Sequence, residues 1–534
     1  MSDKVKKSLV MQGSILALAG IISKIIGFLY RIPMANIMGN TGNGLYSVAF
    51  GIYNIALTLS SYSMPLAVSK LMSERIAKKE YKNAHKLFNK SLLFAFCTGL
   101  IAALVLYFGA EFFAGLYQKE GLERPLRVLA PTTFVVALLG TCRGYFQGHK
   151  NMLPTAVSQV FEQIVNAVVS VLAAGAFVAS CTTQEEIASY GAMGGTFGTL
   201  AGAIFALLIL VGLFIKQGKV RQEELSGGDL ADEENALIFK ALLLTVIPVI
   251  LSQSIYQLGY TLDDYIFGNL MFLKGNDATQ TTNLQGVFNT QYNQMINLPT
   301  AIASAMASAT IPSIVASFTV GNRKRVEEKM SAVLKINMLI AIPSAVGLAV
   351  LADPIMAVLF PRLNEYHDTA VLLLQTGSSA VVFYALSTCT TSILQGCNRM
   401  RVPVIHSGIS LVLHCILVAA LLWFTNLGVL ALIIGNVTFP LLVCVLNCCK
   451  VKKLLDYRFC WMDTFIKPAL AAAVMGVLTF GVYAFSKQYT EAAWLSLILG
   501  ILVALPAYAG MLAVLKVFTK EELKSLPVIG KRIK

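Results

Sequence analysis

A short sequence, Gln147-Gly148-His149-Lys150-Asn151-Met152-Leu153-Pro154, occurs twice in this chain. It returns, with one residue inserted, as Gln395-Gly396-Cys397-Asn398-Arg399-Met400-Arg401-Val402-Pro403. Each copy ends one long apolar stretch and opens the next, so the repeat predicts a duplicated chain built from apolar helices. Two similar helical bundles in one membrane protein are typical of a transporter that alternates its access around a central cavity.

The composition places the chain in a membrane. Hydrophobic residues make up 56% of it and charged residues 13%, and the mean hydropathy is +0.69. In lipid every backbone polar group must be paired within the chain, and the apolar stretches are long enough for helices that cross a bilayer. We predict an all-α polytopic protein with fourteen transmembrane helices, over residues 9–33, 45–70, 88–112, 125–146, 153–179, 190–215, 238–270, 285–320, 332–352, 369–396, 402–424, 428–449, 465–486 and 491–516.

The distribution of basic residues predicts the orientation. Every second loop is rich in Lys and Arg, and such loops stay in the cytoplasm during insertion. The alternate loops carry few cations, among them Lys119, and several acids. We therefore expect both termini in the cytoplasm. The net charge of +14 then reflects topology and contact with anionic lipid headgroups, and we expect no binding of nucleic acid.

Two further correspondences support the duplication. Asn36-Ile37-Met38-Gly39-Asn40 ends the first helix as Tyr265-Ile266-Phe267-Gly268-Asn269 ends the seventh, and Tyr53-Asn54 in the second answers Tyr292-Asn293 in the eighth. Three matches in the same order predict helices one to six and seven to twelve as parallel repeats. The expected domains are an N-terminal lobe (1–216), a cytoplasmic linker (217–237), a C-terminal lobe (238–452), and helices thirteen and fourteen with a cytoplasmic tail (453–534).

Signatures of an enzyme or a cofactor site are absent from the sequence. It contains no Gly-x-x-x-x-Gly-Lys-Ser/Thr phosphate loop, no cysteine pair with zinc or redox spacing, and no acid and base pair with a shared geometry. We expect no enzymatic activity, no cofactor and no metal. An ion gradient, the membrane potential and the substrate gradient all stay open as energy sources.

Two cations mark the first helix. Lys24 and Arg31 are seven residues apart, two turns along one helix face, and would point into a shared volume. Charges that persist at membrane depth usually face a cavity. Arg supplies a planar bidentate donor for phosphate and Lys a mobile point charge, which predicts capture of an anionic headgroup. The alternative is that Arg31 reaches out to the membrane interface while Lys24 pairs with a buried acid.

Asp263 and Asp264 lie near the outer end of helix seven, the repeat counterpart of the Arg31 region. They could balance the charge of helix one or hold a monovalent cation, so we consider them for ion coupling. Adjacent residues point to different sides of a helix. We therefore expect at most one of them to face the cavity and the other to be solvated at the interface.

Polar stripes follow three more helices. Helix five carries Gln159, Glu162, Gln163 and Asn166 at helical spacing, which suits either a cavity lining or hydrogen bonds that fasten the bundle, and we favour the cavity for Glu162. Helix two presents Asn54 and Thr58 on one face, and helix eight presents Asn293 on a related face. Such faces let helices approach closely, but in a two-lobed transporter they also line the gate.

Several motifs give the chain a family resemblance. They are Ser23-Lys24-Ile25-Ile26-Gly27-Phe28, Val48-Ala49-Phe50 with Tyr53-Asn54, Asn297-Leu298-Pro299 with Ile311-Pro312-Ser313, and Arg143-Gly144-Tyr145-Phe146-Gln147-Gly148 through Gln159-Val160-Phe161-Glu162-Gln163. With them the chain resembles the multidrug/oligosaccharidyl-lipid/polysaccharide exporter superfamily. Within it, the chain resembles the polysaccharide-transporter branch that contains stage V sporulation protein B and MurJ-type lipid II flippases.

The resemblance implies a flippase of the bacterial cell membrane. Its cargo would be an undecaprenyl-pyrophosphate-linked precursor, most simply lipid II, which moves from the cytoplasmic to the outer leaflet by alternating access. In that family basic residues of helices one, two and eight line the cavity, and a groove at the last two helices is thought to accept the lipid tail. Lys24 stands where Arg is frequent, whereas Leu57, Thr58 and Gln294 stand where Arg is common. Binding of pyrophosphate would then depend more heavily on Lys24 and Arg31.

Two alternatives stay open beside the lipid II flippase. One is a flippase for another lipid-linked polysaccharide unit, and the other is a cation-coupled drug or metabolite antiporter. The antiporter would need a membrane-embedded acid in an uncharged, aromatic cavity, whereas helix one offers cations. We expect a monomer whose partners are a lipid-linked oligosaccharide, membrane lipids and, for coupling, a monovalent cation.

Overall fold

The computed structural model describes residues 3–218, 233–319, 323–397, 399–455, 460–489 and 492–517. Within these ranges the chain is helical and contains no strand, so the expected all-α fold is confirmed. Most of the expected linker and of the expected cytoplasmic tail lies outside the described residues. The chain divides into two compact units, Met1–Thr290 and Gln291–Lys534.

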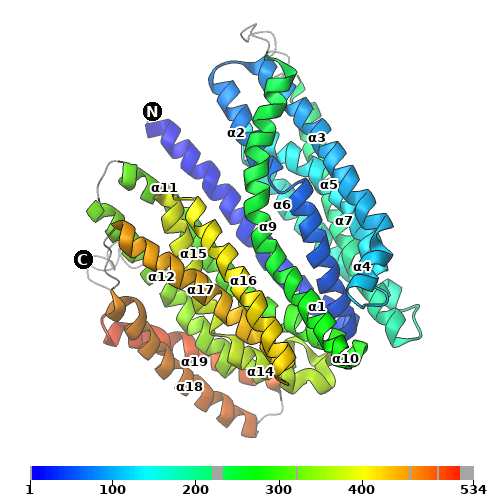
Figure 1. Cartoon of the computed structure of the whole chain (residues 1–534). Helices are drawn as coiled ribbons and strands as arrows, with labels where there is room; N and C mark the ends of the chain where they lie inside the picture. Colours follow the sequence, from blue (N-terminus) through cyan, green and yellow to red (C-terminus); the bar gives the residue numbers. More distant parts are fainter. Residues whose placement is uncertain are drawn as a thin grey trace. The chain divides into compact units, whose positions relative to one another are not determined.

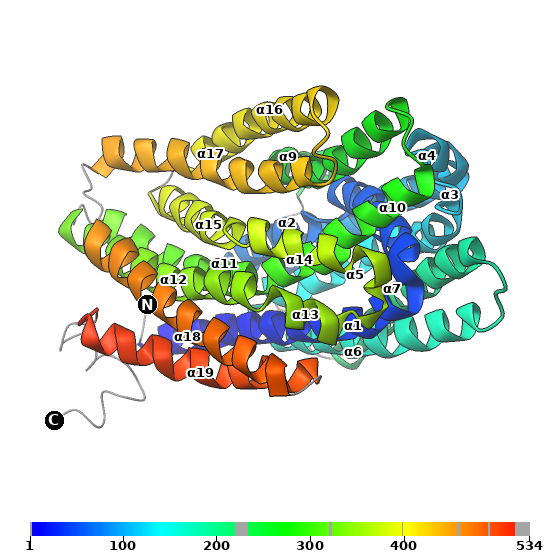
Figure 2. The ribbon, with the colours of Figure 1, turned by 90° about the horizontal axis from the view of Figure 1, so that it is seen from below.

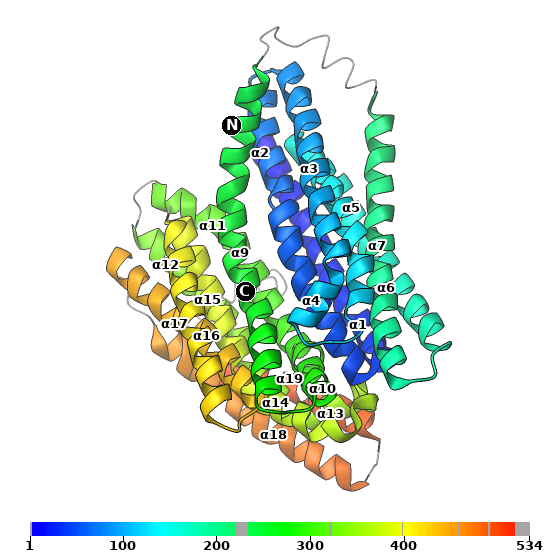
Figure 3. The ribbon, with the colours of Figure 1, turned by 45° about the vertical axis from the view of Figure 1, so that its right-hand side comes forward.

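The first unit is a bundle of long helices joined by short turns. In it α5 packs between α3 and α7, α6 pairs with α7, and α1 packs against α6 (Figure 3). The helices are α1 (Asp3–Ser60), α2 (Met64–Ala77), α3 (Tyr81–Phe108), α4 (Ala110–Leu116), α5 (Glu123–Gly148), α6 (Leu153–Val178), α7 (Gln184–Lys216), α9 (Asn235–Leu273) and α10 (Ala278–Gly286). The π-helical turn η1 (Val287–Tyr292) follows and contains the boundary between the two units.

Helix α1 contains two membrane helices without a loop between them. A straight helix of 58 residues would be about 87 Å long, far more than a bilayer needs. Gly39 interrupts the helical backbone with φ 67° and ψ −177°, a conformation that a residue without Cβ adopts readily. The two halves of α1 therefore run in different directions (Figure 1). A second break follows Ser60, where Pro65 stands in the first turn of α2.

A row of glycines lets α6 and α7 approach closely. Gly194, Gly198 and Gly202 recur every four residues along α7, the spacing of a small-residue seam between membrane helices. A Cβ on Gly198 would lie 2.5 Å from the carbonyl oxygen of Asn166 in α6. A Cβ on Gly202 would lie 2.5 Å from the carbonyl oxygen of Glu162. Both neighbours are backbone atoms, so only glycine fits at these positions.

The second unit contains the remaining helices. Within it α15 packs against α11 and α17, and α16 packs against α17. The last two helices, α18 and α19, lie side by side (Figure 2), and α18 also contacts α12. The elements are α11 (Asn293–Thr319), α12 (Arg323–Val350), α13 (Ala352–Leu359), η2 (Pro361–Tyr366), α14 (His367–Gly377), α15 (Ala380–Gly396), α16 (Arg401–Phe424), α17 (Leu430–Leu455), η3 (Met462–Ile466), α18 (Lys467–Tyr489) and α19 (Ala493–Val514).

Helices occupy every one of the predicted membrane ranges. By length and composition, ten helices of the described chain could cross a membrane, or eleven if the bent pair Pro361–Gly377 and Ala380–Gly396 is one span. One of the ten, Leu18–Ala77, contains the Gly39 turn and so covers two predicted helices. The polytopic architecture is confirmed, and the number fourteen stays a prediction.

Helix α9 packs with the first compact unit. Ile238, Leu242 and Val246, spaced four residues apart, are buried in one apolar cluster with residues of α2 and α3 such as Met64 and Leu87. The division by packing therefore falls after Thr290, whereas the division by sequence repeat was expected at 217–237. Packing and sequence repetition are different properties, and we keep the repeat-based lobes 1–216 and 238–452 as a proposal.

Replacing Gly198 by Ala should destabilise the first unit. The added Cβ would meet a backbone carbonyl that cannot rotate away. Such overpacking costs about 1–3 kcal/mol, more than the gain of at most about 1 kcal/mol in helix propensity. Thermal unfolding of the full chain in nanodiscs measures the effect.

Gly212→Ala is the matched control, because Gly212 lies in the same helix with nothing within 4 Å of an added Cβ. This variant should unfold at the wild-type temperature or slightly above it. If Gly198→Ala behaved like Gly212→Ala, the close packing of α6 on α7 would not contribute to stability.

Candidate functional site

Lys24 and Arg31 share one exposed face of α1. On a neighbouring face, Ser23 donates a hydrogen bond to the carbonyl of Gln159 in α6 (3.3 Å), and the hydroxyl of Tyr30 accepts one from Asn166 (3.3 Å). The side chains of Lys24 and Arg31 themselves are exposed. Seven residues rotate a helix by only about 20° from its starting direction, so the two cations point the same way.

Four exposed apolar side chains in the first half of α1 form a stripe whose centre lies on a different face. Leu18, Ile22, Ile25 and Leu29 recur at spacings of three and four and are exposed, as expected for a surface that meets lipid. Arg31 is two residues from Leu29, a rotation of about 160° about the helix axis. Arg31 is therefore turned away from the apolar stripe, and Lys24 lies at its side, one residue from Ile25.

The polar stripe of α6 divides between two neighbours. Glu162 accepts a hydrogen bond of 2.5 Å from Arg143 of α5, and this ion pair keeps only 16% (Arg143) and 19% (Glu162) of its side-chain surface exposed. Arg143 also donates to Ser158 (3.3 Å). Asn166 contacts Tyr30 and accepts a hydrogen bond from Ser170 (2.9 Å). Two of the four side chains of the stripe, Glu162 and Asn166, thus join helices, and the assignment of Glu162 to a cavity stays a prediction.

The polar face of the second half of α1, which is the predicted helix two, meets α9 and the turn η1 before α11. Asn289 donates to Ser47 (3.3 Å) and to Asp264 (2.6 Å). Thr261 of α9 donates to the carbonyl of Gly51 (3.4 Å). Farther along the same face, Asn54 is half-buried, and Thr58 is buried with its hydroxyl donating to the carbonyl of Asn54 (2.8 Å).

Asn293 and Gln294 are both buried at the start of α11. Tyr292, just before them, fastens this end of the helix, because its hydroxyl donates to the carbonyl of Gly377 (3.0 Å) and contacts Asn436 (3.1 Å). Both contacts lie within the second unit. The assignment of Asn293 and Gln294 to cargo binding stays a prediction.

Asp263 and Asp264 are both buried, with 7% and 6% of their surface exposed. The expectation that one of them is solvated at the interface is therefore wrong. The reason is that this end of α9 is covered within its own unit. Gln285 of α10 donates to the backbone carbonyl of Asp264 (2.8 Å), and a Cβ on Gly51 of α1 would lie 3.9 Å from its carboxylate.

Lys119 is a buried cation that the sequence placed among the loop charges. It lies in the turn between α4 and α5, is 5% exposed, and donates to the hydroxyl of Thr282 (2.8 Å). Burial lowers the pKa of its ammonium to about 8, although attraction to Asp264 opposes the shift. Only a contact 163 residues away in sequence reveals this burial, and no local signal indicates it.

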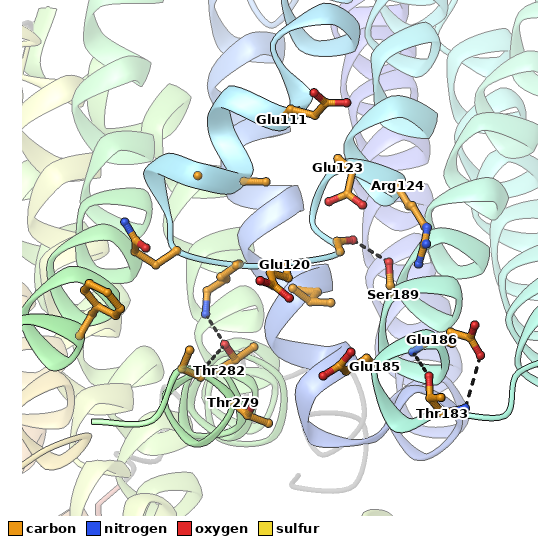
Figure 4. A pocket seen from close by; sticks show the side chains of 18 residues that line it. Glu111, Glu120, Glu123, Arg124, Thr183, Glu185, Glu186, Ser189, Thr279 and Thr282 are labelled. Atoms are coloured by element: carbon orange, nitrogen blue, oxygen red, sulfur yellow. Dashed lines mark hydrogen bonds between the residues drawn. The ribbon is translucent and has the colours of Figure 1, made fainter. Parts of the chain in front are cut away.

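Lys119 also lines a cavity of about 820 Å³ within the first unit. Five acidic side chains are among the residues that line it, and they come from α4, α5, α7 and the turn between α4 and α5 (Figure 4). Arg124 stacks on the ring of Tyr190, with its guanidinium carbon 4.3 Å from the ring centre. Ser189 donates to the carbonyl of Gly121 (2.7 Å) and fixes the turn that carries Lys119. Ten of the residues that line the cavity are labelled in Figure 4: Glu111, Glu120, Glu123, Arg124, Thr183, Glu185, Glu186, Ser189, Thr279 and Thr282.

Comparison with protein families gives two matches. Residues 9–318 match the family described as polysaccharide biosynthesis protein, and residues 289–420 match MatE. The first match covers more than half of the chain. The resemblance inferred from the motifs is therefore confirmed.

Individual proteins are similar over most of the chain. The lipid II flippase MurJ of Bacillus subtilis (strain 168) is 27% identical over 76% of this chain and 75% of its own length. Stage V sporulation protein B of the same organism is 25% identical over 97% of this chain and 98% of its own length. A solved structure of the lipid II flippase MurJ in an inward closed conformation superposes with a TM-score of 0.68, at 15% identity, over 93% of this chain and 98% of that one. At that identity the likeness concerns the fold alone.

Removing one partner of the Arg143–Glu162 pair should cost more than removing both. Glu162→Gln leaves a guanidinium that is mostly buried without its counter-ion, and breaking a fully buried pair in this way costs about 3–5 kcal/mol. The double variant Arg143→Met/Glu162→Gln removes that unpaired charge and should recover part of the loss. A double-mutant cycle of unfolding in nanodiscs measures the coupling.

The Arg127–Glu111 pair is the matched control, since its N···O distance is 2.6 Å but its side chains are 43% and 78% exposed. Glu111→Gln should change the unfolding temperature little, because exposed pairs contribute weakly. Purely additive effects of the two substitutions at Arg143 and Glu162 would contradict a stabilising pair.

Proposed function

This chain belongs to the polysaccharide biosynthesis protein family, and on that premise we propose that it is a flippase for lipid II. It would move this undecaprenyl-pyrophosphate-linked precursor from the cytoplasmic to the outer leaflet of the bacterial cell membrane. The observation that carries the proposal is the similarity to the lipid II flippase MurJ over 76% of the chain. The many apolar helices and the fold shared with the solved MurJ structure agree with this proposal of a transporter rather than an enzyme.

The exposed cations of α1 supply the chemistry that the cargo needs. A pyrophosphate cannot enter hydrocarbon without a large loss of hydration energy, whereas the apolar prenyl chain is favourably solvated by hydrocarbon. Lys24 and Arg31 offer two positive charges that point the same way and lie about 10 Å apart along the helix axis. With the N-terminus in the cytoplasm, Lys24 would meet the diphosphate first and Arg31 would receive it nearer the outer leaflet.

Alternating access would let the polar headgroup cross while the lipid tail stays outside. The headgroup site would open to one side of the membrane at a time, and Asn54, Thr58, Glu162, Asn293 and Gln294 would contribute polar contacts. The paired helices α18 and α19 would accept the prenyl chain. We propose that the chain acts as a monomer with both termini in the cytoplasm, and that a monovalent cation coupled through Asp263 or Asp264 assists the cycle.

A second candidate is a flippase for another lipid-linked polysaccharide unit. It is favoured by the similarity to stage V sporulation protein B, which extends over 97% of the chain. The same cations would hold the same diphosphate, so the two candidates differ in the sugar and not in the chemistry of Lys24 and Arg31.

Lys24→Ala and Arg31→Ala should each slow the flipping of lipid II by at least about tenfold, since a hydrogen bond to a charged group contributes about 1.5–3 kcal/mol. Lys24→Arg should retain most of the rate, because it keeps the charge. Fluorescent lipid II in proteoliposomes, quenched from outside at successive times, measures the rate.

Lys216→Ala is the control, because it removes an exposed lysine at the end of α7 in the same unit. Wild-type rates in Lys24→Ala and Arg31→Ala would remove these residues from the cargo site and leave the function standing. If wild-type protein did not move lipid II but moved another lipid-linked oligosaccharide, the second candidate would replace the first.

A further inference from the structure

Lys119 and Asp264 are two buried ions of opposite charge from distant segments of the first unit. Their opposite charges attract each other. Each is also hydrogen-bonded to a neutral group, Lys119 to Thr282 (2.8 Å) and Asp264 to Asn289 (2.6 Å). Through these contacts the two ions connect the turn after α4 with α9, α10 and η1. Asn289 and Thr282 also reach α1, at Ser47 and Gly44.

Neither charge can change without affecting the other. A proton added to Asp264 would leave the buried ammonium uncompensated, and a proton lost from Lys119 would do the same to the carboxylate. Burial lowers the pKa of Lys119 to about 8, so its ammonium releases a proton in mildly alkaline solution, whereas a hydrated lysine would keep its proton there.

Lys119, one member of the pair, can be reached by water from the cavity. Lys119 and Thr282 both line the space of about 820 Å³ in the first unit, and Figure 4 shows Thr282 at its wall. A proton that leaves the ammonium therefore passes directly to cavity water. The other charged groups around Lys119 come from α4, α5, α7, α9 and its own turn, and they are Glu111, Glu120, Glu123, Arg124, Glu185, Glu186 and Asp263. Acids outnumber cations among them, which favours proton supply to the cavity.

We propose that Lys119 and Asp264 form a proton-binding site that couples the transport cycle to the pH on the side of this cavity. The coupling rests on the proposed function, whereas the titration of the site does not. In the closed arrangement Lys119 gives one proton to cavity water and becomes a neutral amine. When the turn opens and the amine is hydrated, it takes one proton back from water.

The sign of the pH dependence follows from the two states of Lys119. Its pKa is about 8 when buried and about 10.4 when hydrated. The buried arrangement therefore gains stability as pH rises from about 8 to about 10 and loses it as pH falls through that window. The ratio of the two arrangements changes by up to about tenfold per pH unit there.

The first test uses full-length chain in proteoliposomes with fluorescent lipid II and an imposed pH gradient. Wild-type flipping should change several-fold with the gradient, and Lys119→Met should flip at a rate that does not respond to it. Lys216→Met, which alters an exposed lysine, should respond as wild type does. A Lys119→Met variant that flips and responds like wild type would overturn the site while the proposed function stands.

A second measurement needs no cargo. The difference in unfolding temperature between wild type and Lys119→Met should vary with pH between about 8 and 10 and be constant below, as linkage requires. A difference that is flat over this range would overturn the proposal even if lipid II is not the cargo. Absence of lipid II flipping by wild type would instead count against the proposed function.

Thr282→Val covers the case in which Lys119→Met does not fold. It removes the hydroxyl that accepts a hydrogen bond from the ammonium and keeps both charges. The charged form of buried Lys119 then loses support, so the lower edge of the pH window should move to lower pH, whereas the upper edge, set by the hydrated amine, should stay. A window at the wild-type position would contradict the assigned role of Lys119.

Discussion

A charge that leaves water must find a compensating charge or hydrogen bond within the protein, and this requirement governs the charged side chains of the first unit. Arg143 and Glu162 meet it by direct contact between α5 and α6. Lys119 and Asp264 meet it through neutral partners and mutual attraction. Lys24 and Arg31 are exposed instead. The first two arrangements hold helices together, and the third leaves positive charge available to an anionic ligand.

Close backbone approach supplies the rigidity that such buried pairs need. The glycine row of α7 brings its backbone against the carbonyl oxygens of Asn166 and Glu162 in α6. Glu162 is therefore positioned by its own backbone as well as by Arg143. A buried ion pair is stabilising only when its geometry is maintained, so the small residues of α7 and the charge on α6 depend on each other.

The sequence alone was sufficient to predict the helices, because apolar length is a local property and each predicted range is occupied by helix. It also identified the Gly39 motif as the end of the first helix. It did not predict the burial of Lys119, because Thr282 and Asp264 lie more than a hundred residues away and a lysine in a loop is usually solvated. The solvated carboxylate expected at Asp263 or Asp264 was wrong for the same reason. Arg143 and Glu162 lie seven residues before and twelve residues after Lys150, so the sequence places both near one turn but does not show that they pair.

The turn at Gly39 has a mechanical consequence. The two halves of α1 are joined by one residue with a left-handed backbone. No loop therefore lies between the half that carries Lys24 and Arg31 and the half that carries Asn54 and Thr58. If the first half rotates about its axis, the dihedral angles of Gly39 must absorb the twist or the second half must turn with it. The backbone of Gly39 thus decides whether a rotation of the segment that carries Lys24 and Arg31 is absorbed or is transmitted to the segment that carries Asn54 and Thr58.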